Sequence, residues 1–420
     1  MTYNEAVEYM NSTAWFGAKP GLERMEKLAS AIGDPQKKLR FVHIAGTNGK
    51  GSCAAMTASV LRAAGYKTGL FTSPYLYRFN ERMQINGEQI SDEALALAAE
   101  LVKKAADSME DKPTAFELMT AAAFAWFAAE ECDIVVLEAG LGGRFDATNV
   151  IEAPEAEVIM NIGLDHTAVL GDTIEKIAAE KAGIIKKNTV CVSYQQEKSV
   201  KAVIEARCAE VGAKLVEADF SLLAPEFDSL EGQVFMYKDR MCAIPLLGAH
   251  QQKHAAVVVE VIGALRERGW KIDDDAIEHG LYAVNWPGRF EVLSDEPYFV
   301  ADGGHNPQGA ETVADDLARY FPNDRRVLLL GFLKDKDYKT MLDILLPAGD
   351  EFVCVTPESP RALPAQELRD MIEAAGKPAT ACEDIKDAVA KAQELAEDGM
   401  VCACGSLYMV GEIRACFGLR

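Results

Sequence analysis

Apolar residues along this chain gather in short, nearly uncharged runs, each followed by a longer segment in which they recur at helical spacing. The runs cover residues 41–45, 133–137, 156–162 and 190–193. The helical segments cover residues 53–64, 91–108, 114–130, 173–184 and 197–211. Continuous apolar runs are typical of parallel strands buried on both faces, and alternation of strand and helix builds such a sheet. The pattern predicts an α/β fold with a doubly wound, mostly parallel sheet.

A second strand–helix series begins after a break rich in turn-forming residues. The segment Asn285-Trp-Pro287-Gly288-Arg289-Phe-Glu291 has the composition of a linker, and new strands are expected at 298–301 and 326–330. A chain of 420 residues is long enough to bury two cores. We therefore predict an N-terminal domain over residues 1–288 and a smaller, Rossmann-like α/β domain over residues 289–420.

Three stretches fit the alternating pattern less well. Residues 3–32 have the pattern of amphipathic helical pieces interrupted by Lys19-Pro20-Gly21, and residues 214–247 that of short strands covering one side of the first domain. Residues 72–87 form a long connection with turn signals and weak periodicity, and such loops are usually functional or mobile. Two more helices are expected over residues 248–268 and 273–283.

The charge balance narrows the range of partners. There are 43 Lys and Arg residues against 65 Asp and Glu, which gives a net charge of −22. Such a field repels nucleic acid and anionic membrane surfaces, so we expect neither as a partner. An anionic small molecule could still bind where basic groups or Mg²⁺ are concentrated locally. A monomer is expected.

The cysteines and the N-terminal segment point to the cytoplasm. None of the ten cysteines lies in a C-x-x-C pair, so they are expected to be buried thiols in a reducing compartment. The N-terminal segment lacks the basic and apolar regions of a signal peptide. The most apolar stretches, 121–129 and 255–265, are too short to span a bilayer.

The first apolar run leads into a glycine-rich loop that has the layout of a phosphate-binding site. After Phe41–Ala45 come Gly46, Thr47, Asn48, Gly49, Lys50, Gly51 and Ser52, and then a helical segment. Backbone amides of the loop, the positive end of the helix dipole and the Lys50 charge would converge on a phosphate, and Ser52 could hold Mg²⁺. The common G-x-x-x-x-G-K-[ST] motif is matched imperfectly, because Ile44 replaces its first glycine and Gly51 separates the lysine from the serine. A tight turn is the alternative interpretation.

Two more polar residues follow apolar runs, as Lys50 does. Glu138 and His166 would lie at the carboxyl ends of parallel strands, where doubly wound sheets bind their ligands. Glu138 could instead be a solvated strand end, and His166 a histidine satisfied in the core. Lys181 has the spacing of an ordinary surface lysine. Gly140, Gly142 and Gly143 do not have the dinucleotide-binding spacing.

The second series carries its own candidates. Asp302 and His305 follow its first strand and would face that domain's ligand edge, whereas Asn306 and Pro307 fit an ordinary helix start. Arg289 could be a linker surface charge, or it could swing toward a nucleotide phosphate.

Together these segments resemble the folylpolyglutamate synthase/dihydrofolate synthase family of the Mur ligases, in order over nearly the whole chain. The matching motifs are Pro20-Gly-Leu-Glu-Arg24, Ala45 through Ser52, Thr72-Ser-Pro74, Arg78 through Arg82, Glu138 through Asn149, Asp165-His166, Glu180-Lys-Ala-Gly183, Leu247 through Gln251, Pro287 through Glu291, Asp302 through Pro307 and Gly405 through Tyr408. The resemblance also accounts for the extended form of the glycine loop.

The resemblance implies an amide ligase. In the family, ATP phosphorylates the terminal carboxylate of a reduced folate, and the amino group of L-glutamate then attacks the acyl phosphate. Some members use dihydropteroate as the acceptor, and the sequence leaves that activity open.

Site residues carry over one by one. Lys50 and the loop amides resemble the β/γ-phosphate cradle, and Ser52, Ser73, Glu138 and His166 resemble the ligands of two Mg²⁺ sites. Lys181 matches a lysine that the family carries as a carbamate. Arg289 and Asp302 match contacts to ATP, His305 a residue near the reacting end, Ser406 the incoming-glutamate pocket, and Ser73 through Arg82 a loop over the pterin.

This chain departs from the family pattern at two positions. His254 stands where asparagine is common near adenine, which makes the nucleotide base preference less certain. Gly304 stands where alanine is usual, and it adds backbone freedom.

Two other functions compete with the folate ligase. A nucleotide-driven switch or binding protein would use the same phosphate loop, but the chain has no N-K-x-D guanine motif and a second domain would be surplus. A cell-wall Mur ligase is disfavoured because residues 1–40 are too few for a separate UDP-sugar domain.

Overall fold

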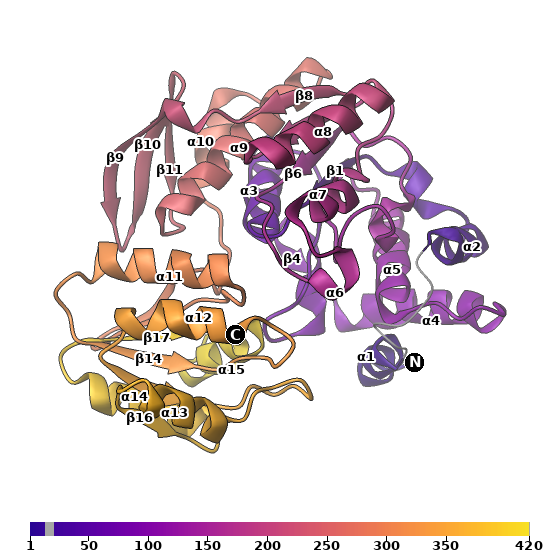
Figure 1. Ribbon diagram of the computed structural model, residues 1–420. Helices are drawn as coiled ribbons and strands as arrows, with labels where there is room; N and C mark the ends of the chain where they lie inside the picture. The colour runs from indigo at the N-terminus through magenta and orange to yellow at the C-terminus, as the bar shows by residue number, and fades with distance from the viewer. Residues whose placement is uncertain (13–20, 420) are drawn as a thin grey trace. The chain divides into compact units, whose positions relative to one another are not determined.

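The computed structural model describes residues 1–12 and 21–419, which form two compact units (Figure 1). The first unit contains Met1–Ala224, Met236–Cys242 and Lys253–Val284, and the second contains Pro225–Phe235, Ala243–Gln252 and the chain from Asn285 onward. Lys19 and Pro20, predicted to interrupt two helical pieces, lie outside the described residues. The division of function between residues 1–288 and 289–420 stays a prediction.

The first unit is built around one eight-stranded sheet with the order β4-β3-β2-β5-β1-β6-β7-β8. Its strands are β1 (Phe41–Ala45), β2 (Thr68–Phe71), β3 (Met83–Ile85), β4 (Glu88–Gln89), β5 (Ile134–Glu138), β6 (Ala156–Ile159), β7 (Val190–Ser193) and β8 (Lys214–Glu217). The run from β2 to β8 is parallel throughout. The chain moves from β1 toward β2 on one side and later toward β6 on the other, so β1 lies at the switch point where such sheets bind ligands.

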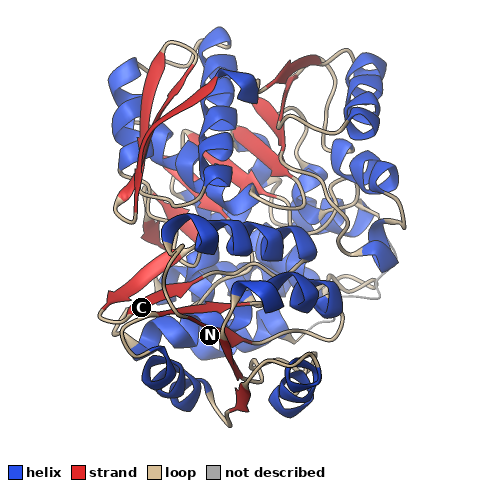
Figure 2. Ribbon diagram, turned by 60° about the vertical axis from the view of Figure 1, so that its left-hand side comes forward, coloured by secondary structure: helices blue, strands red, loops and turns tan. Residues whose placement is uncertain are grey.

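Helices cover both faces of this sheet (Figure 2). They are α1 (Tyr3–Asn11), α2 (Glu23–Ala31), α3 (Lys50–Ala63), α4 (Asp92–Asp107), α5 (Ala115–Ala129), α6 (Thr167–Leu170), α7 (Ile174–Ala182), α8 (Lys198–Val211) and α10 (Asp274–Tyr282), with short 3₁₀ turns η1 (Pro35–Lys38), η2 (Phe79–Arg82), η3 (Ala147–Val150) and η4 (Phe220–Leu222). Helix α9 (Ala249–Glu267) contributes its first turn to the second unit and the rest to the first.

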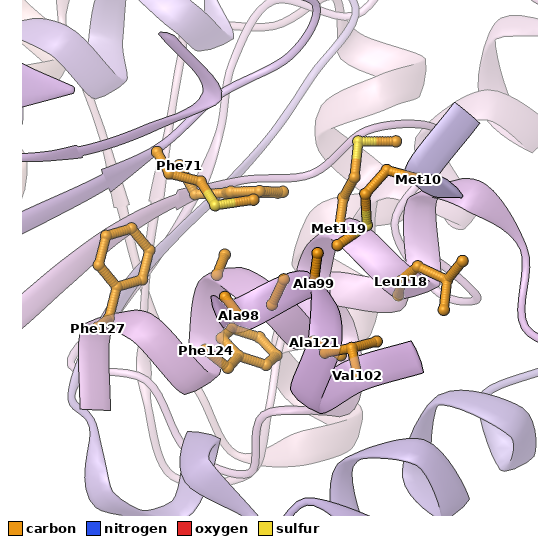
Figure 3. Packing of buried hydrophobic residues seen from close by; sticks show 14 of the residues in the cluster. Met10, Phe71, Ala98, Ala99, Val102, Leu118, Met119, Ala121, Phe124 and Phe127 are labelled. Atoms are coloured by element: carbon orange, nitrogen blue, oxygen red, sulfur yellow. The ribbon is translucent and has the colours of Figure 1, made fainter. Parts of the chain in front are cut away.

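Apolar packing explains why these helices form. Helix α5 is buried almost all round, and its Phe124 and Phe127 belong to one apolar cluster with Phe71 of β2 and Val102 of α4 (Figure 3). On α7 and α8 a second cluster includes Ile177 and Ile204. Because both faces of the central strands are covered, those strands need no polar face, which is why their sequences are continuous apolar runs.

A smaller sheet follows β8. It consists of β9 (Leu223–Ser229), β10 (Gly232–Tyr237) and β11 (Arg240–Ile244), in the order β11-β10-β9. The prediction of short strands over residues 214–247 is confirmed, but β8 does not belong with them. It continues the main parallel sheet beside β7.

The second unit contains a six-stranded sheet with the order β12-β13-β17-β14-β15-β16, in which only β12 is antiparallel. Its strands are β12 (Glu291–Asp295), β13 (Tyr298–Ala301), β14 (Arg326–Leu330), β15 (Glu351–Cys354), β16 (Ala379–Ala381) and β17 (Met400–Cys404). Its helices are α11 (Pro307–Tyr320), α12 (Tyr338–Leu345), α13 (Ala365–Ala374), α14 (Ile385–Ala396) and α15 (Leu407–Cys416), with the 3₁₀ turn η5 (Leu346–Ala348). Alternate residues of β14 belong to two different apolar clusters, so this sheet is also covered on both faces.

The predicted α/β fold class is confirmed, but several local expectations are wrong. Helix α3 begins at Lys50, three residues before the predicted start at Cys53, because the glycine loop leads straight into its first turn. Residues 72–87 are not a plain connection, since they contain η2 and β3, which pairs with β2. β12 was not predicted, because the second series was expected to begin with the strand at 298–301 and β12 lies between the linker and that strand.

Thiol burial follows the expectation with exceptions. All ten cysteines are free and eight are buried, but Cys382 is half-buried and Cys416 is exposed. Within residues 1–12 and 21–419, none of the helices combines the length and the apolar character needed to cross a lipid bilayer.

Helix α10 packs on α3 at Gly280, and this contact yields a prediction. A Cβ at position 280 would lie 2.4 Å from the Val60 Cα, whereas a Cβ at Gly263 of α9 would meet no atom within 4 Å. In a helix, alanine normally stabilises by about 1 kcal/mol relative to glycine. We expect Gly280→Ala to lower the free energy of unfolding by about 1–3 kcal/mol through overpacking, and Gly263→Ala to raise it by up to about 1 kcal/mol.

Urea unfolding of the two variants and the wild type measures this difference. Equal midpoints for Gly280→Ala and Gly263→Ala would contradict the close approach of α10 and α3.

Candidate functional site

The glycine-rich loop lies between β1 and α3, as predicted. Gly49 adopts a left-handed conformation with φ of 82°, and the chain then enters the first turn of α3 at Lys50. The Thr47 and Asn48 amides donate to the Asn161 carbonyl at 2.8 and 3.3 Å, which anchors the loop to the chain leaving β6. The amides at the start of α3 have no partner within the helix ladder and carry the positive end of its dipole, which suits an anionic phosphate.

The structure brings Lys50, Ser73 and Glu138 together. Glu138 ends β5 and is only 4% exposed. Its Oε2 accepts a hydrogen bond from the Ser73 amide at 3.2 Å, and its Oε1 lies 3.9 Å from the Lys50 Nζ. Lys50 also donates to the Thr47 carbonyl at 3.2 Å. The alternative that Glu138 is a solvated strand end is therefore wrong. Ser52 is buried in the first turn of α3.

Lys181 is not a surface lysine. It is 5% exposed, and its Nζ donates to the Gly46 carbonyl at 2.7 Å, so it reaches the phosphate loop from α7. The expectation from spacing failed because Lys181 lies one turn after Ile177 and Ala178 on the buried face of the helix. That i, i+3, i+4 relation to two apolar residues was the signal in the sequence.

His166 lies at the end of the β6 segment with its side chain 35% exposed, so it is not a core histidine. It has a left-handed backbone, with φ of 51°, and forms the N-terminal cap position of α6. Its amide donates to the Asp165 Oδ1 at 2.8 Å, and its Nε2 lies 3.9 Å from the same oxygen. The imidazole is therefore partly exposed in the segment between β6 and α6.

His254 of α9 packs directly against the phosphate loop. It is buried, and a Cβ at Gly49 would lie 2.4 Å from its Nε2. The ring of Tyr194, which follows β7, lies 6.2 Å from the His254 ring and 4.6 Å from that of Phe220. Burial raises the pKa of Tyr194 to about 12, so its hydroxyl stays protonated. Sequence reasoning missed Tyr194, although its place after a buried strand was the signal.

The segment from Ser73 to Arg82 has internal order. The Glu81 carboxylate accepts hydrogen bonds from the backbone amides of Leu76, Tyr77 and Arg78. Arg82 is 3% exposed, and its guanidinium carbon lies 5.0 Å from the Tyr75 ring centre and 5.6 Å from that of Phe79. Arg82 therefore holds two aromatic rings of this segment by cation–π contacts. Its assignment as a substrate contact stays a prediction.

The predicted residues of the second unit meet at the carboxyl ends of β13 and β17. Asp302 is buried and accepts hydrogen bonds from the Phe290 and Gly304 amides, at 2.8 and 2.6 Å. Burial raises the pKa of Asp302, and the Arg289 charge partly opposes this. A Cβ at Gly303 would lie 2.8 Å from the Arg289 Nη1, so the guanidinium is seated beside this loop.

His305 and Ser406 complete the same edge. The His305 Nδ1 lies 3.0 Å from the Gly303 carbonyl oxygen, and the Gly405 amide donates to the Gly304 carbonyl at 3.1 Å. Ser406 caps α15 by accepting from the Tyr408 amide, and Asn306 caps α11 by accepting from Gly309. The bland interpretation of Asn306 and Pro307 as a helix start is confirmed. A Cβ at Gly304 would lie 2.9 Å from the Asp302 Oδ1, so this glycine also gives that carboxylate room.

The first unit thus offers amides, a cation, a carboxylate and an imidazole along one sheet edge. Among the described residues, no group of three His, Cys, Asp or Glu side chains could hold a metal by itself. One carboxylate with serine hydroxyls suits Mg²⁺, which prefers oxygen, keeps several waters and usually binds substrate phosphates as well. The donor set therefore fits a metal that arrives with a nucleotide.

Comparison with known proteins extends this picture to the whole chain. Residues 44–262 match the family model of the Mur ligase middle domain, and residues 288–407 match that of the Mur ligase glutamate ligase domain. The chain is 37% identical over 425 residues to the dihydrofolate synthase/folylpolyglutamate synthase of Bacillus subtilis, covering 98% of both chains.

Solved structures agree with the sequence relatives. Mycobacterium tuberculosis folylpolyglutamate synthase complexed with ADP is similar with a TM-score of 0.90 and 32% identity, covering 100% of this chain and 98% of that one. E. coli FolC in complex with DHPP and ADP is similar with a TM-score of 0.88 and 28% identity, covering 99% and 97%. Both domain models match in this order, and the alignments cover nearly the whole chain. The chain therefore belongs to the folylpolyglutamate synthase/dihydrofolate synthase family of the Mur ligases.

Proposed function

We propose that this protein is an ATP-dependent amide ligase that joins L-glutamate to the terminal glutamate γ-carboxylate of a reduced folate through an acyl phosphate. The observation that carries the proposal is the phosphate loop, with the Lys50 ammonium beside the buried Glu138 carboxylate. Membership of the ligase family supports the reaction type. A nucleotide-driven switch is the alternative that the experiments below distinguish.

In this proposal the phosphate loop binds the ATP phosphates. The amides at the start of α3 donate to phosphate oxygens, and Lys50 neutralises part of the charge that develops between the β- and γ-phosphates. Ser52, Ser73, Glu138 and His166 are the proposed holders of two Mg²⁺ ions, directly or through water. Bound Mg²⁺ would supply charge neutralisation and orientation of the phosphates.

The chemistry then follows from the poor electrophilicity of a carboxylate. An oxygen of the folate γ-carboxylate attacks the γ-phosphorus, ADP leaves, and the carboxyl carbon gains phosphate as its leaving group. The neutral amine of L-glutamate attacks that carbon, the new C–N bond forms, and phosphate leaves as the amine loses a proton. Cationic groups are required throughout because every reactant is an anion.

The second unit has proposed roles in the same reaction. Arg289 contacts a nucleotide phosphate, Asp302 the ribose, His305 the reacting end and Ser406 the incoming glutamate. His254 and the ring of Tyr194 border the adenine. Closure of the domains about residues 285–291 is part of the proposal.

Lys181 is proposed to act as a carbamate. Its ammonium first loses one proton. The neutral amine then adds to CO₂, forms a C–N bond and releases a second proton, so that a cation becomes an anion able to help hold a second Mg²⁺. A carbamate nitrogen keeps one N–H group. The modified nitrogen can therefore still donate to the Gly46 carbonyl, which the unmodified Nζ contacts at 2.7 Å.

The acceptor range and setting complete the proposal. Dihydropteroate is a second proposed acceptor, in keeping with the complex of the E. coli relative with DHPP. We further propose that the enzyme is a cytoplasmic monomer, in keeping with its free thiols.

The reaction itself gives a prediction. Incubation with ATP, Mg²⁺, tetrahydrofolate and labelled L-glutamate should yield a folate heavier by one glutamate, with ATP consumed only when both substrates are present. A parallel reaction with dihydropteroate tests the second acceptor. Mass spectrometry and ADP release measure both. ATP hydrolysis that is indifferent to glutamate would favour the switch instead.

The carbamate proposed on Lys181 gives a second prediction. Lys181→Ala should lower kcat by roughly 100-fold or more, because the anion proposed to help hold the second Mg²⁺ is lost. Lys176→Ala, an exposed lysine on the same helix, is the matched control and should keep full activity. ¹³C-labelled bicarbonate should give one carbamate NMR signal in the wild type. Its presence in Lys181→Ala would refute the assignment.

A further inference from the structure

A buried polar cluster lies under the phosphate loop, outside the site described so far. His43 occupies the middle of β1, and Glu157 is its register partner on β6. Both side chains are fully buried. Register partners on adjacent strands point to the same face of a sheet, so the imidazole and the carboxyl group are neighbours. Neither residue is used in the proposed reaction.

One end of the cluster fixes the protonation of His43. The Thr148 hydroxyl donates to the Asp146 Oδ1 at 2.5 Å and lies 2.8 Å from the His43 Nε2. A hydroxyl has a single proton, which here goes to Asp146, so Thr148 must accept from His43. His43 is therefore protonated on Nε2, and its Nδ1 is an acceptor.

The other end leaves two polar atoms to be satisfied. Within the described part of the chain, the His43 Nδ1 and the Glu157 Oε2 are buried and make no hydrogen bond. The Glu157 Oε1 accepts from the Lys186 amide at 2.9 Å. Buried polar atoms are almost always paired with protein or with an internal water. A protonated Oε2 is a donor, so it can serve the acceptor Nδ1 through one water molecule.

Burial makes Glu157 easier to protonate, and the hydrogen bonds from Thr189 and the Lys186 amide and the charge of Lys186 oppose this effect. Burial raises the pKa of Glu157 to about 7, and burial lowers the pKa of His43 to about 3. The groups facing Glu157 from the packed elements are His43, Lys186, Thr189, Cys191, Cys208 and, beyond Lys186, Arg207. Of these, Lys186 is turned toward the Asn149 carbonyl, which its Nζ reaches at 3.0 Å, and burial lowers its pKa too.

The chain of hydrogen bonds ends in the loop that follows Glu138. The Asp146 carboxylate accepts from the Leu141 amide at 2.8 Å and from the Thr148 amide at 3.0 Å, which closes the loop on itself. The Arg144 amide in this loop donates to the Glu180 carbonyl at 2.8 Å. The loop thus seats the turn of α7 that carries Lys181.

A glycine in the same loop tightens this contact. A Cβ at Gly143 would lie 2.8 Å from the backbone oxygens of both Glu180 and Lys181. The loop and α7 are therefore in direct backbone contact, so a shift of the loop would also move the backbone of Lys181.

We propose that Glu157, His43, Thr148 and Asp146 form one buried hydrogen-bond chain, completed by a water between the His43 Nδ1 and Glu157, and that His43 is a positioning residue for the loop behind Glu138. The hydrogen-bond chain fixes the loop, and the loop fixes the end of α7. The loop follows Glu138 and α7 carries Lys181, and these two residues supply the anionic groups assigned to magnesium. The link to magnesium rests on the proposed function, but the hydrogen-bond chain does not.

Proton NMR correlated with ¹⁵N-labelled histidine tests the chain directly. The protein has six histidines, so each imidazole can be followed, and His43→Gln identifies its signals by their loss. We expect one imidazole that stays protonated on Nε2 alone between roughly pH 5 and pH 9, with a slowly exchanging N–H. A His43 ring protonated on Nδ1, or one that titrates in this range, would overturn the chain even in an inactive protein.

Magnesium dependence tests the positioning role. His43→Leu removes both hydrogen bonds at similar volume, whereas His43→Gln keeps a donor and an acceptor. We expect the Mg²⁺ concentration for half-maximal activity to rise roughly tenfold or more in His43→Leu and to change much less in His43→Gln. His279→Gln, at an exposed position on α10, controls for histidine replacement.

Circular dichroism and thermal unfolding establish that each variant is folded. A folded His43→Leu with the magnesium dependence of the wild type would overturn the positioning role. Loss of ligase activity in the wild type would refute the proposed function while leaving the NMR result to decide the hydrogen-bond chain.

Discussion

The structure of the first unit depends on the pairing of β1 with β5 and β6. Ile44 is in register with Glu138 on one side, and His43 with Glu157 on the other. This register brings the end of β5 beside the start of the phosphate loop, so that the buried Glu138 and Lys50 come within 3.9 Å. A shift by one residue would turn Glu138 to the opposite face of the sheet. The apolar covering of both faces therefore fixes this register, and the register determines which polar groups meet at the carboxyl end of the sheet.

The same logic places the residues of the second unit. β13 and β17 are parallel neighbours, and the segments leaving them carry Asp302 and Ser406. The two glycines after Asp302 let the backbone of one segment bond to the other, as the Gly405 amide does to the Gly304 carbonyl. Each unit thus builds an edge from the same device: parallel strands buried on both faces and polar residues only where those strands stop.

Much of this architecture could be predicted from the order of the residues alone. The central strands, the main helices and the phosphate loop followed from apolar runs and helical spacing, and family motifs identified most of the candidate residues. Prediction failed where long-range pairing overrides local pattern. β3 and β12 form by pairing with the edges of β2 and β13, and their own short sequences do not predict this pairing.

Site residues were hardest to predict where their environment, buried or exposed, cannot be inferred from the neighbouring sequence. Lys181 has an ordinary composition around it, and only its contact with Gly46 separates it from a solvated lysine. His166 was undecided between core and surface until the fold placed it at an exposed turn. The roles of these residues in binding and catalysis go beyond what burial determines, since they depend on ligands.

The contact between Gly49 and His254 has a consequence for the redesign of nucleotide preference. The imidazole occupies the volume that any side chain at position 49 would need, so two positions far apart in the sequence share one space. A smaller residue at 254 would leave a gap behind the loop that α3 begins from, and a larger one would push the loop outward. Libraries that vary position 254, the proposed neighbour of adenine, should therefore sample shapes close to that of imidazole before they sample new hydrogen-bonding groups.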